Sequence, residues 1–279
     1  MLRFIALVAM TGALGAWVFG RLVLTRLPPD ADAGAVDALR ALARRTLAWC
    51  AGALAITAPL RVAAARDITL LPLASSLDRL LLLQGLIAAL VAGTLVLHRH
   101  APRSPRLVDA GLATVVLIAP WLAHAGSAIE LRAVAIVVDI LHMVAAGGWL
   151  GALALVTMAV MRARRSDDGP AREVALLGAF HAVAVVAAPV VFVTGLIAAW
   201  LRMGVPEGIA SSTYSGLFVA KLLLVGVTGF IGAGHSRLAT RRVTVAAPAQ
   251  VMRSLAAECL LAVGVLYVTA VLVGTAPIG

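Results

Sequence analysis

The sequence predicts an all-α, polytopic membrane helix bundle of about eight transmembrane helices, and its composition and periodicity carry that prediction. Of the 279 residues, 62% are hydrophobic and only 13% are charged, whereas a soluble domain has roughly 45–50% apolar and about 25% charged residues. The mean hydropathy is +1.02. Apolar residues gather in runs of about 20, the length that an α-helix needs to cross a bilayer. Because lipid offers backbone groups no hydrogen-bond partner, such runs must be helical.

Eight apolar segments follow one another, separated by polar breaks such as LPPDADAG after the first and RARRSDDGP after the fifth. The first segment continues to Leu24, which exceeds the apolar region of about 7–15 residues in a signal peptide, so we expect a retained helix. No repeat and no soluble domain is evident, and residues 1–279 are expected to form a single integral membrane domain. The expected spans are 4–25, 42–62, 77–97, 107–125, 133–161, 174–201, 215–235 and 255–275.

The distribution of arginines predicts the orientation of the bundle. Cytoplasmic connectors of membrane proteins are enriched in Lys and Arg, and here the odd-numbered connectors carry most of the arginines. The second connector is an exception, with Arg61, Arg66 and Arg79. We therefore expect both termini to be periplasmic, and we attribute the net charge of +10 to topology and not to nucleic-acid binding. The odd connectors hold Arg26, Arg40, Arg44 and Arg45, then Arg99, Arg103 and Arg106, then Arg162, Arg164, Arg165 and Arg172, then Arg237, Arg241, Arg242 and Arg253.

A polar pair stands in the fifth segment, DILHMVAAGGWLGAL, at residues 139–153. Asp139 and His142 are three residues apart and therefore share a helix face, which Trp149 also shares. The small residues between Ala145 and Gly151 narrow this helix, so that neighbouring helices can approach closely. A charged residue near the centre of a span costs about 2.5–3.5 kcal/mol on insertion, and such residues usually mark a site or a pathway.

Other polar groups fall at the same outer level in this topology, namely His124, Met203, Tyr214 and Lys221. Imidazole and carboxylate together suit a transition metal, and imidazole suits copper. The carboxylate can instead orient the histidine by accepting its second N–H. For Lys221 we favour an ion pair with Asp139, because pairing two buried charges lowers the cost of both.

A second group of residues falls toward the cytoplasmic side. His181 and His235 there are most simply interfacial or core histidines. Cys50 and Cys259 form no CxxC motif and are most simply small buried hydrophobes, although two thiolates could also pass Cu(I) onward. Met143 and Met203 are weaker candidates for soft metal ligands.

An ordered set of motifs resembles the copper resistance D (CopD) family of bacterial inner-membrane proteins. The set consists of His124-Ala-Gly, Asp139-x-x-His142, Trp149-x-Gly151, Phe180 leading to Gly195, Tyr214 seven residues before Lys221, and Arg237. The resemblance covers about residues 120–240, whereas residues 1–106 share only hydrophobicity with the family.

This resemblance implies an inner-membrane protein that moves a copper ion from periplasm to cytoplasm, often with a periplasmic CopC-type copper-binding protein as partner. Carried over to this sequence, it implies that His124, Asp139 and His142 form the metal site. It also implies supporting roles for Trp149, Tyr214 and Lys221. His181 is a weaker metal candidate from the sequence alone, because it stands where the family usually has a small hydroxyl residue.

Two alternatives stay open. Paired histidines on neighbouring helices are typical of haem-b electron carriers, and His124 with His142, and His181 with His235, would form two such pairs. The protein could also be a non-transporting membrane partner of a periplasmic copper chaperone. The sequence contains no plausible nucleophile triad, phosphate-binding loop or HExxH motif, so we do not expect an enzyme, and it leaves the oligomeric state open.

Overall fold

The computed structural model describes residues 1–29, 31–64, 75–98, 105–122, 131–165, 169–203, 213–240 and 248–274. Within these ranges every regular element is a helix, and eight helices are long and apolar enough to cross a membrane, which confirms the predicted fold class. The elements are α1 (Leu2–Val18), a π-turn η1 (Phe19–Val23), a 3₁₀-turn η2 (Leu24–Arg26), α2 (Ala33–Ala64), α3 (Ser76–Leu97), α4 (Pro105–Ile118), a 3₁₀-turn η3 (Ala119–Leu122), α5 (Arg132–Ala163), α6 (Gly169–Met203), α7 (Thr213–Thr240) and α8 (Pro248–Leu272).

The helices extend beyond the apolar segments, most clearly in α2. This helix begins at Ala33, whereas the sequence predicted a span from residue 42. Its first turns, AGAVDALRALARR, are polar on one side but rich in Ala, Leu and Arg, which favour helix strongly. A bond of 2.8 Å between Asp37 and Arg40 adds an ion pair of spacing i, i+3. Arg40, Arg44 and Arg45 therefore lie within helix α2 and not in a connector.

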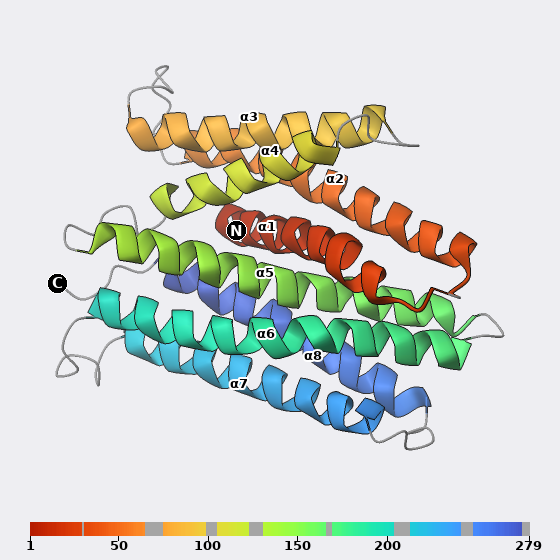
Figure 1. The fold of residues 1–279 in the computed structure, drawn as a ribbon. Coiled ribbons are helices and arrows are strands. Elements are labelled where there is room, and N and C mark those ends of the chain that lie inside the picture. Colours follow the sequence, from red (N-terminus) through yellow and green to blue (C-terminus); the bar gives the residue numbers. More distant parts are fainter. Residues whose placement is uncertain are drawn as a thin grey trace.

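Helices α1 and α5 form the centre of the bundle (Figure 1). Helix α1 packs between α2 and α5, α5 packs along α6, α3 covers α2, and α7 pairs with α8. The second half of α5 is the most deeply buried stretch, and Ala152, Leu153, Val156 and Val160 are fully buried there. This core is assembled from small and branched apolar side chains.

The closest helix contact is between α1 and α5. A Cβ atom on Gly15 would lie 2.3 Å from the Cα atom of Gly151, and a Cβ atom on Gly151 would lie 2.1 Å from the carbonyl oxygen of Thr11. Only glycine at both positions allows the two backbones to touch. The narrow helix predicted from the small residues thus has α1 as its close neighbour.

Both termini lie at one end of the bundle, which we call the terminal end (Figure 1). Arg3 Nη1 donates a hydrogen bond of 3.4 Å to the carbonyl of Val273, and the rings of Phe4 and Tyr267 meet edge to face with centroids 6.0 Å apart. Helices α5 and α7 begin at this end, and α2, α6 and α8 finish there. That this end faces the periplasm stays a prediction from the arginine distribution.

Ion pairs join the helices at the opposite end. Arg164 donates two hydrogen bonds, of 2.8 and 2.6 Å, to the carboxylate of Glu173, which links α5 to α6. Asp109 on α4 accepts from Trp17 Nε1 at 2.8 Å and from Arg21 at 2.6 Å, which links α4 to the end of α1. These contacts tie α5 to α6 and α4 to the end of α1 at this end of the bundle.

Candidate functional site

A cavity of about 250 Å³ opens in the interior of the bundle toward the terminal end. Its walls are mainly apolar and come from helices that are far apart in the sequence, from α1 to α8. Few polar side chains reach it, so each of them has a strong influence on what the cavity can hold. The polar and charged lining residues are Arg3, Thr11, Arg61, Gln84, Asp139, His142, Lys221 and Thr269.

His142 is held in one orientation by α6. Its Nδ1 atom lies 3.0 Å from Oγ1 of Thr194. The single hydroxyl hydrogen of Thr194 is directed at the carbonyl oxygen of Val190, so the hydroxyl must accept from the imidazole. In the neutral ring this places the proton on Nδ1 and the lone pair on Nε2, the arrangement of a histidine that ligates metal through Nε2.

The backbone of α6 also packs against the imidazole ring. A Cβ atom on Gly195 would lie 3.4 Å from Cε1 of His142, so a side chain at this position would press on the ring. His142 is ten residues from the start of α5 at Arg132, or about 15 Å along the helix axis. The ring therefore occupies a defined position well inside the bundle.

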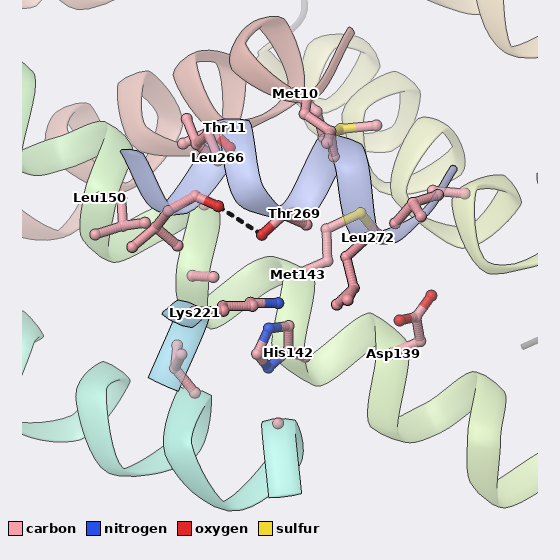
Figure 2. A pocket seen from close by; sticks show the side chains of 18 of the residues that line it. Met10, Thr11, Asp139, His142, Met143, Leu150, Lys221, Leu266, Thr269 and Leu272 are labelled. Atoms are coloured by element: carbon pink, nitrogen blue, oxygen red, sulfur yellow. Dashed lines mark hydrogen bonds between the residues drawn. The ribbon is translucent and has the colours of Figure 1, made fainter. Parts of the chain in front are cut away.

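Asp139 and Lys221 reach the same cavity, from α5 and α7 respectively (Figure 2). Asp139 stands one turn closer to the terminal end than His142, as expected for residues that share a helix face. In Figure 2 the ammonium end of Lys221 points toward the imidazole of His142. The ion pair between Asp139 and Lys221 stays a prediction, and the structure places both groups on one cavity.

Two thioethers line the cavity as well. Met143 was a weak candidate from the sequence, and Met10 was not a candidate at all. Figure 2 shows the sulfur atoms of both side chains on the side of the cavity where α1 faces α5. No local pattern connects residues 10 and 143. Both line the same cavity because α1 packs on α5.

Trp149 closes the inner side of the cavity. Its side chain is 4% exposed and lies about two turns deeper along α5 than His142. A Cβ atom on Gly229 of α7 would lie 3.9 Å from Cη2 of the indole, so the ring packs flush against that helix. The predicted supporting position thus acts as a wall between the cavity and the packed half of the bundle.

Several predicted residues are not part of the described cavity. His124 lies outside the described residues, and the side chains of Met203, Tyr214 and His235 do as well. His181 stands thirteen residues before Thr194 on α6, about 20 Å along the helix, and is half-buried away from the cavity.

The two cysteines also lie away from this cavity. Cys50 packs on Gly12, and a Cβ atom on Gly12 would lie 2.6 Å from the Sγ atom of Cys50. The Sγ atom of Cys259 is 3.5 Å from the hydroxyl of Thr157. Their half-buried positions agree with the interpretation of cysteine as a small packing residue.

The described residues contain no group of three or more His, Cys, Asp and Glu side chains that could hold a metal ion. Asp139 and His142 therefore supply two such groups at most in this part of the chain. Further ligands would have to be softer, as the two thioethers are, or come from His124.

One buried acid was missed by the sequence reasoning. Glu258 on α8 is 2% exposed, and a Cβ atom on Gly232 of α7 would lie 3.5 Å from its Oε2 atom. The eighth span was expected from residue 255, and Glu258 was not singled out. Because α8 begins at Pro248, the acid lies ten residues inside the helix. An acid within a long apolar run was the signal that could have revealed it.

Comparison with known proteins bears on one part of the chain. Residues 174–272 match the family model described as Copper resistance protein D. No curated protein and no solved structure matches the chain. The matched segment spans most of α6 and all of α7 and α8, and it contains Thr194 and Lys221, whereas Asp139 and His142 precede it. The match confirms the predicted resemblance over residues 174–272, and the chain is a multi-pass membrane protein in which this segment is similar to the copper resistance protein D family.

Proposed function

We propose that this protein binds a copper ion in the cavity at the terminal end and moves it across the inner membrane. The observation that carries the proposal is the bond between His142 and Thr194, which fixes the orientation of the imidazole on the cavity wall. The match to a copper-resistance family favours copper over other metals that imidazole binds.

The cavity offers copper a mixed set of ligands. Nε2 of His142 is the first, and Asp139 serves either as a second ligand or as the carboxylate that balances the charge of Lys221. The thioethers of Met10 and Met143 are soft ligands, which select Cu(I). His124 is a further predicted ligand.

The direction of transport follows from the predicted orientation. If the arginine-poor terminal end is periplasmic, copper enters the cavity from the periplasm and leaves toward the cytoplasm. A periplasmic copper-binding protein of the CopC type is then a natural donor. In the alternative without transport, the same cavity receives copper from such a donor but does not release it on the other side.

Uptake by proteoliposomes that contain the purified protein alone tests the proposal. We expect His142→Ala to lose bound copper and copper accumulation inside the vesicles. His98→Ala is the matched control, because His98 lies at the opposite end and its Nδ1 atom is engaged by the carbonyl of Thr94 at 3.1 Å. Copper binding and uptake by His142→Ala at the level of the wild-type protein would disprove the assignment. Copper bound by the wild-type protein without uptake would support the non-transporting alternative.

The volume of the cavity argues for an ion and against a porphyrin. Pockets for drug-sized ligands measure roughly 300–1,000 Å³, and the cavity around His142 measures about 250 Å³. A visible spectrum of the purified protein checks this directly, because a haem protein would show a Soret band that shifts on reduction.

A further inference from the structure

Two arginines meet at the terminal end of the bundle. Arg3 on α1 and Arg61 on α2 both line the cavity of His142, and both also line a wider hollow of about 1,020 Å³. This second hollow lies between α1, α2, α3 and α8. Arg61 is half-buried and Arg3 is exposed, and both reach the same two hollows. Two guanidinium groups on one hollow attract an anion.

The two arginines outnumber the acidic residues on the described walls of this hollow. Asp78 is the one acidic residue among its described lining residues. Its carboxylate accepts a bond of 2.6 Å from the hydroxyl of Ser75, which in turn caps the start of α3 by accepting from the Asp78 N–H at 3.1 Å. Arg3 donates to the carbonyl of Val273, a neutral group, at 3.4 Å.

The rest of the hollow is apolar. Leu77 and Leu81 of α3, Leu122 of η3, and Tyr267 and Val271 of α8 form its walls. The hollow thus combines the two guanidinium groups with mainly apolar walls. Its volume of about 1,020 Å³ is far larger than a small inorganic anion needs. A phospholipid has this same division between an anionic head group and hydrocarbon chains.

The position of Arg61 gives independent support. The sequence marked it as one of three arginines that break the asymmetry of the connectors. In the structure Arg61 is not in a connector but inside α2, three residues before its end, with its side chain on the two cavities. A role in binding explains an arginine at an end of the bundle where orientation disfavours it.

We propose that Arg3 and Arg61 bind a phosphate group, supplied by the head group of an acidic phospholipid whose hydrocarbon lies against the apolar walls of the hollow. Guanidinium groups bind phosphate through paired, charge-assisted hydrogen bonds, and basic pockets between transmembrane helices bind lipid head groups in this way. This site does not depend on copper binding. Its occupation would lower the positive potential beside the cavity of His142.

Native mass spectrometry of the detergent-purified full chain, with phosphatidylglycerol or phosphatidylcholine added, tests the proposal. We expect the wild-type protein to retain phosphatidylglycerol in preference to phosphatidylcholine. The double variant Arg3→Gln, Arg61→Gln should bind phosphatidylglycerol at least about tenfold more weakly. The matched control is Arg26→Gln, Arg40→Gln, which removes the same charge from exposed positions at the opposite end and should bind like the wild-type protein.

Thermal unfolding with inorganic phosphate, without added lipid, separates the two sources of phosphate. Protection of the wild-type protein by phosphate alone, lost in the double variant, would support the phosphate site and identify the free ion as its ligand. Equal retention of phosphatidylglycerol by the wild-type protein and the double variant would overturn the proposal. If the double variant does not fold, Arg61→Lys and Arg61→Gln replace it. Retention of phosphatidylglycerol by Arg61→Lys but not by Arg61→Gln supports the site. Equal retention of phosphatidylglycerol by these two variants contradicts it.

Discussion

The two halves of the bundle hold their polar groups in opposite ways. Toward the terminal end, Asp139, His142 and Lys221 line an open cavity. In the other half Thr157 and Glu258 are buried among close-packed helices, at 9% and 2% exposure, and Thr157 donates to the carbonyl of Leu153 at 2.9 Å. Polar groups that line a hollow are available to a ligand, whereas those in packed surroundings serve the fold. The comparison separates residues expected to affect copper from residues expected to affect stability.

The largest effect is expected from the helix contact in the packed region. Gly151→Leu would drive a side chain into the backbone of α1, where even a Cβ atom would lie 2.1 Å from the carbonyl oxygen of Thr11. Overpacking costs about 1–3 kcal/mol when neighbours can shift, and more when the obstacle is backbone, so we expect loss of the folded protein. Gly178→Leu is the control, because a Cβ atom at Gly178 meets nothing within 4 Å. Thermal unfolding in detergent measures both, and similar melting temperatures would contradict the packing argument.

Removing one threonine hydroxyl from each half tests whether polar groups in the two halves have different roles. Thr194→Val keeps the shape of the side chain but removes the oxygen that accepts from His142. Loss of such an orienting partner lowers metal affinity by about 10–100-fold. Thr157→Val makes the same change in the packed half, and we expect it to cost about 1 kcal/mol of stability and to leave copper affinity unchanged.

Copper titration and thermal unfolding of the two threonine variants provide the readouts. Thr194→Ser should restore the affinity, because it returns the hydroxyl. Equal copper affinities for both valine variants would erase the proposed difference between the two halves.

The smallest effect concerns the thioether from α1. Met10→Leu preserves volume and should change stability by less than about 1.5 kcal/mol. If Met10 helps to bind Cu(I), the variant should bind Cu(I) a few-fold more weakly, because leucine offers no sulfur. Met158→Leu is the control, since Met158 is 38% exposed on the surface of α5. Competition with a Cu(I) chelator measures the difference, and identical affinities in the two variants would remove Met10 from the ligand set.

The fold class could be predicted because each helix that crosses a membrane needs a run of about 20 apolar residues, and such runs are visible in the sequence. Eight apolar runs led to eight helices, and the spacing of Asp139 and His142 led to a shared face. The start of α2 could not be found from hydropathy, because Ala33–Leu42 is helical through propensity and not through apolar character.

The surroundings of His142 were harder to predict, because they depend on which helices pack together. Thr194 is 52 residues away in the sequence, Met10 is 132 residues away, and neither shows a local pattern with His142. The sequence predicted close approach at Gly151 but did not identify α1 as the neighbour. Arg61 was counted with the second connector although it falls at the end of the expected span 42–62, and the structure places it within α2.

The contact between Gly15 and Gly151 limits how this bundle can move. Two helices whose backbones touch cannot slide past each other by a fraction of a turn, because each would have to ride over the other's side chains. Helices α1 and α5 therefore behave as one rigid body, which carries Met10, Asp139 and His142 together. Under the proposed transport, any rearrangement of the cavity would therefore come from the helices around this body, which include α6, α7 and α8 of the family-matched segment.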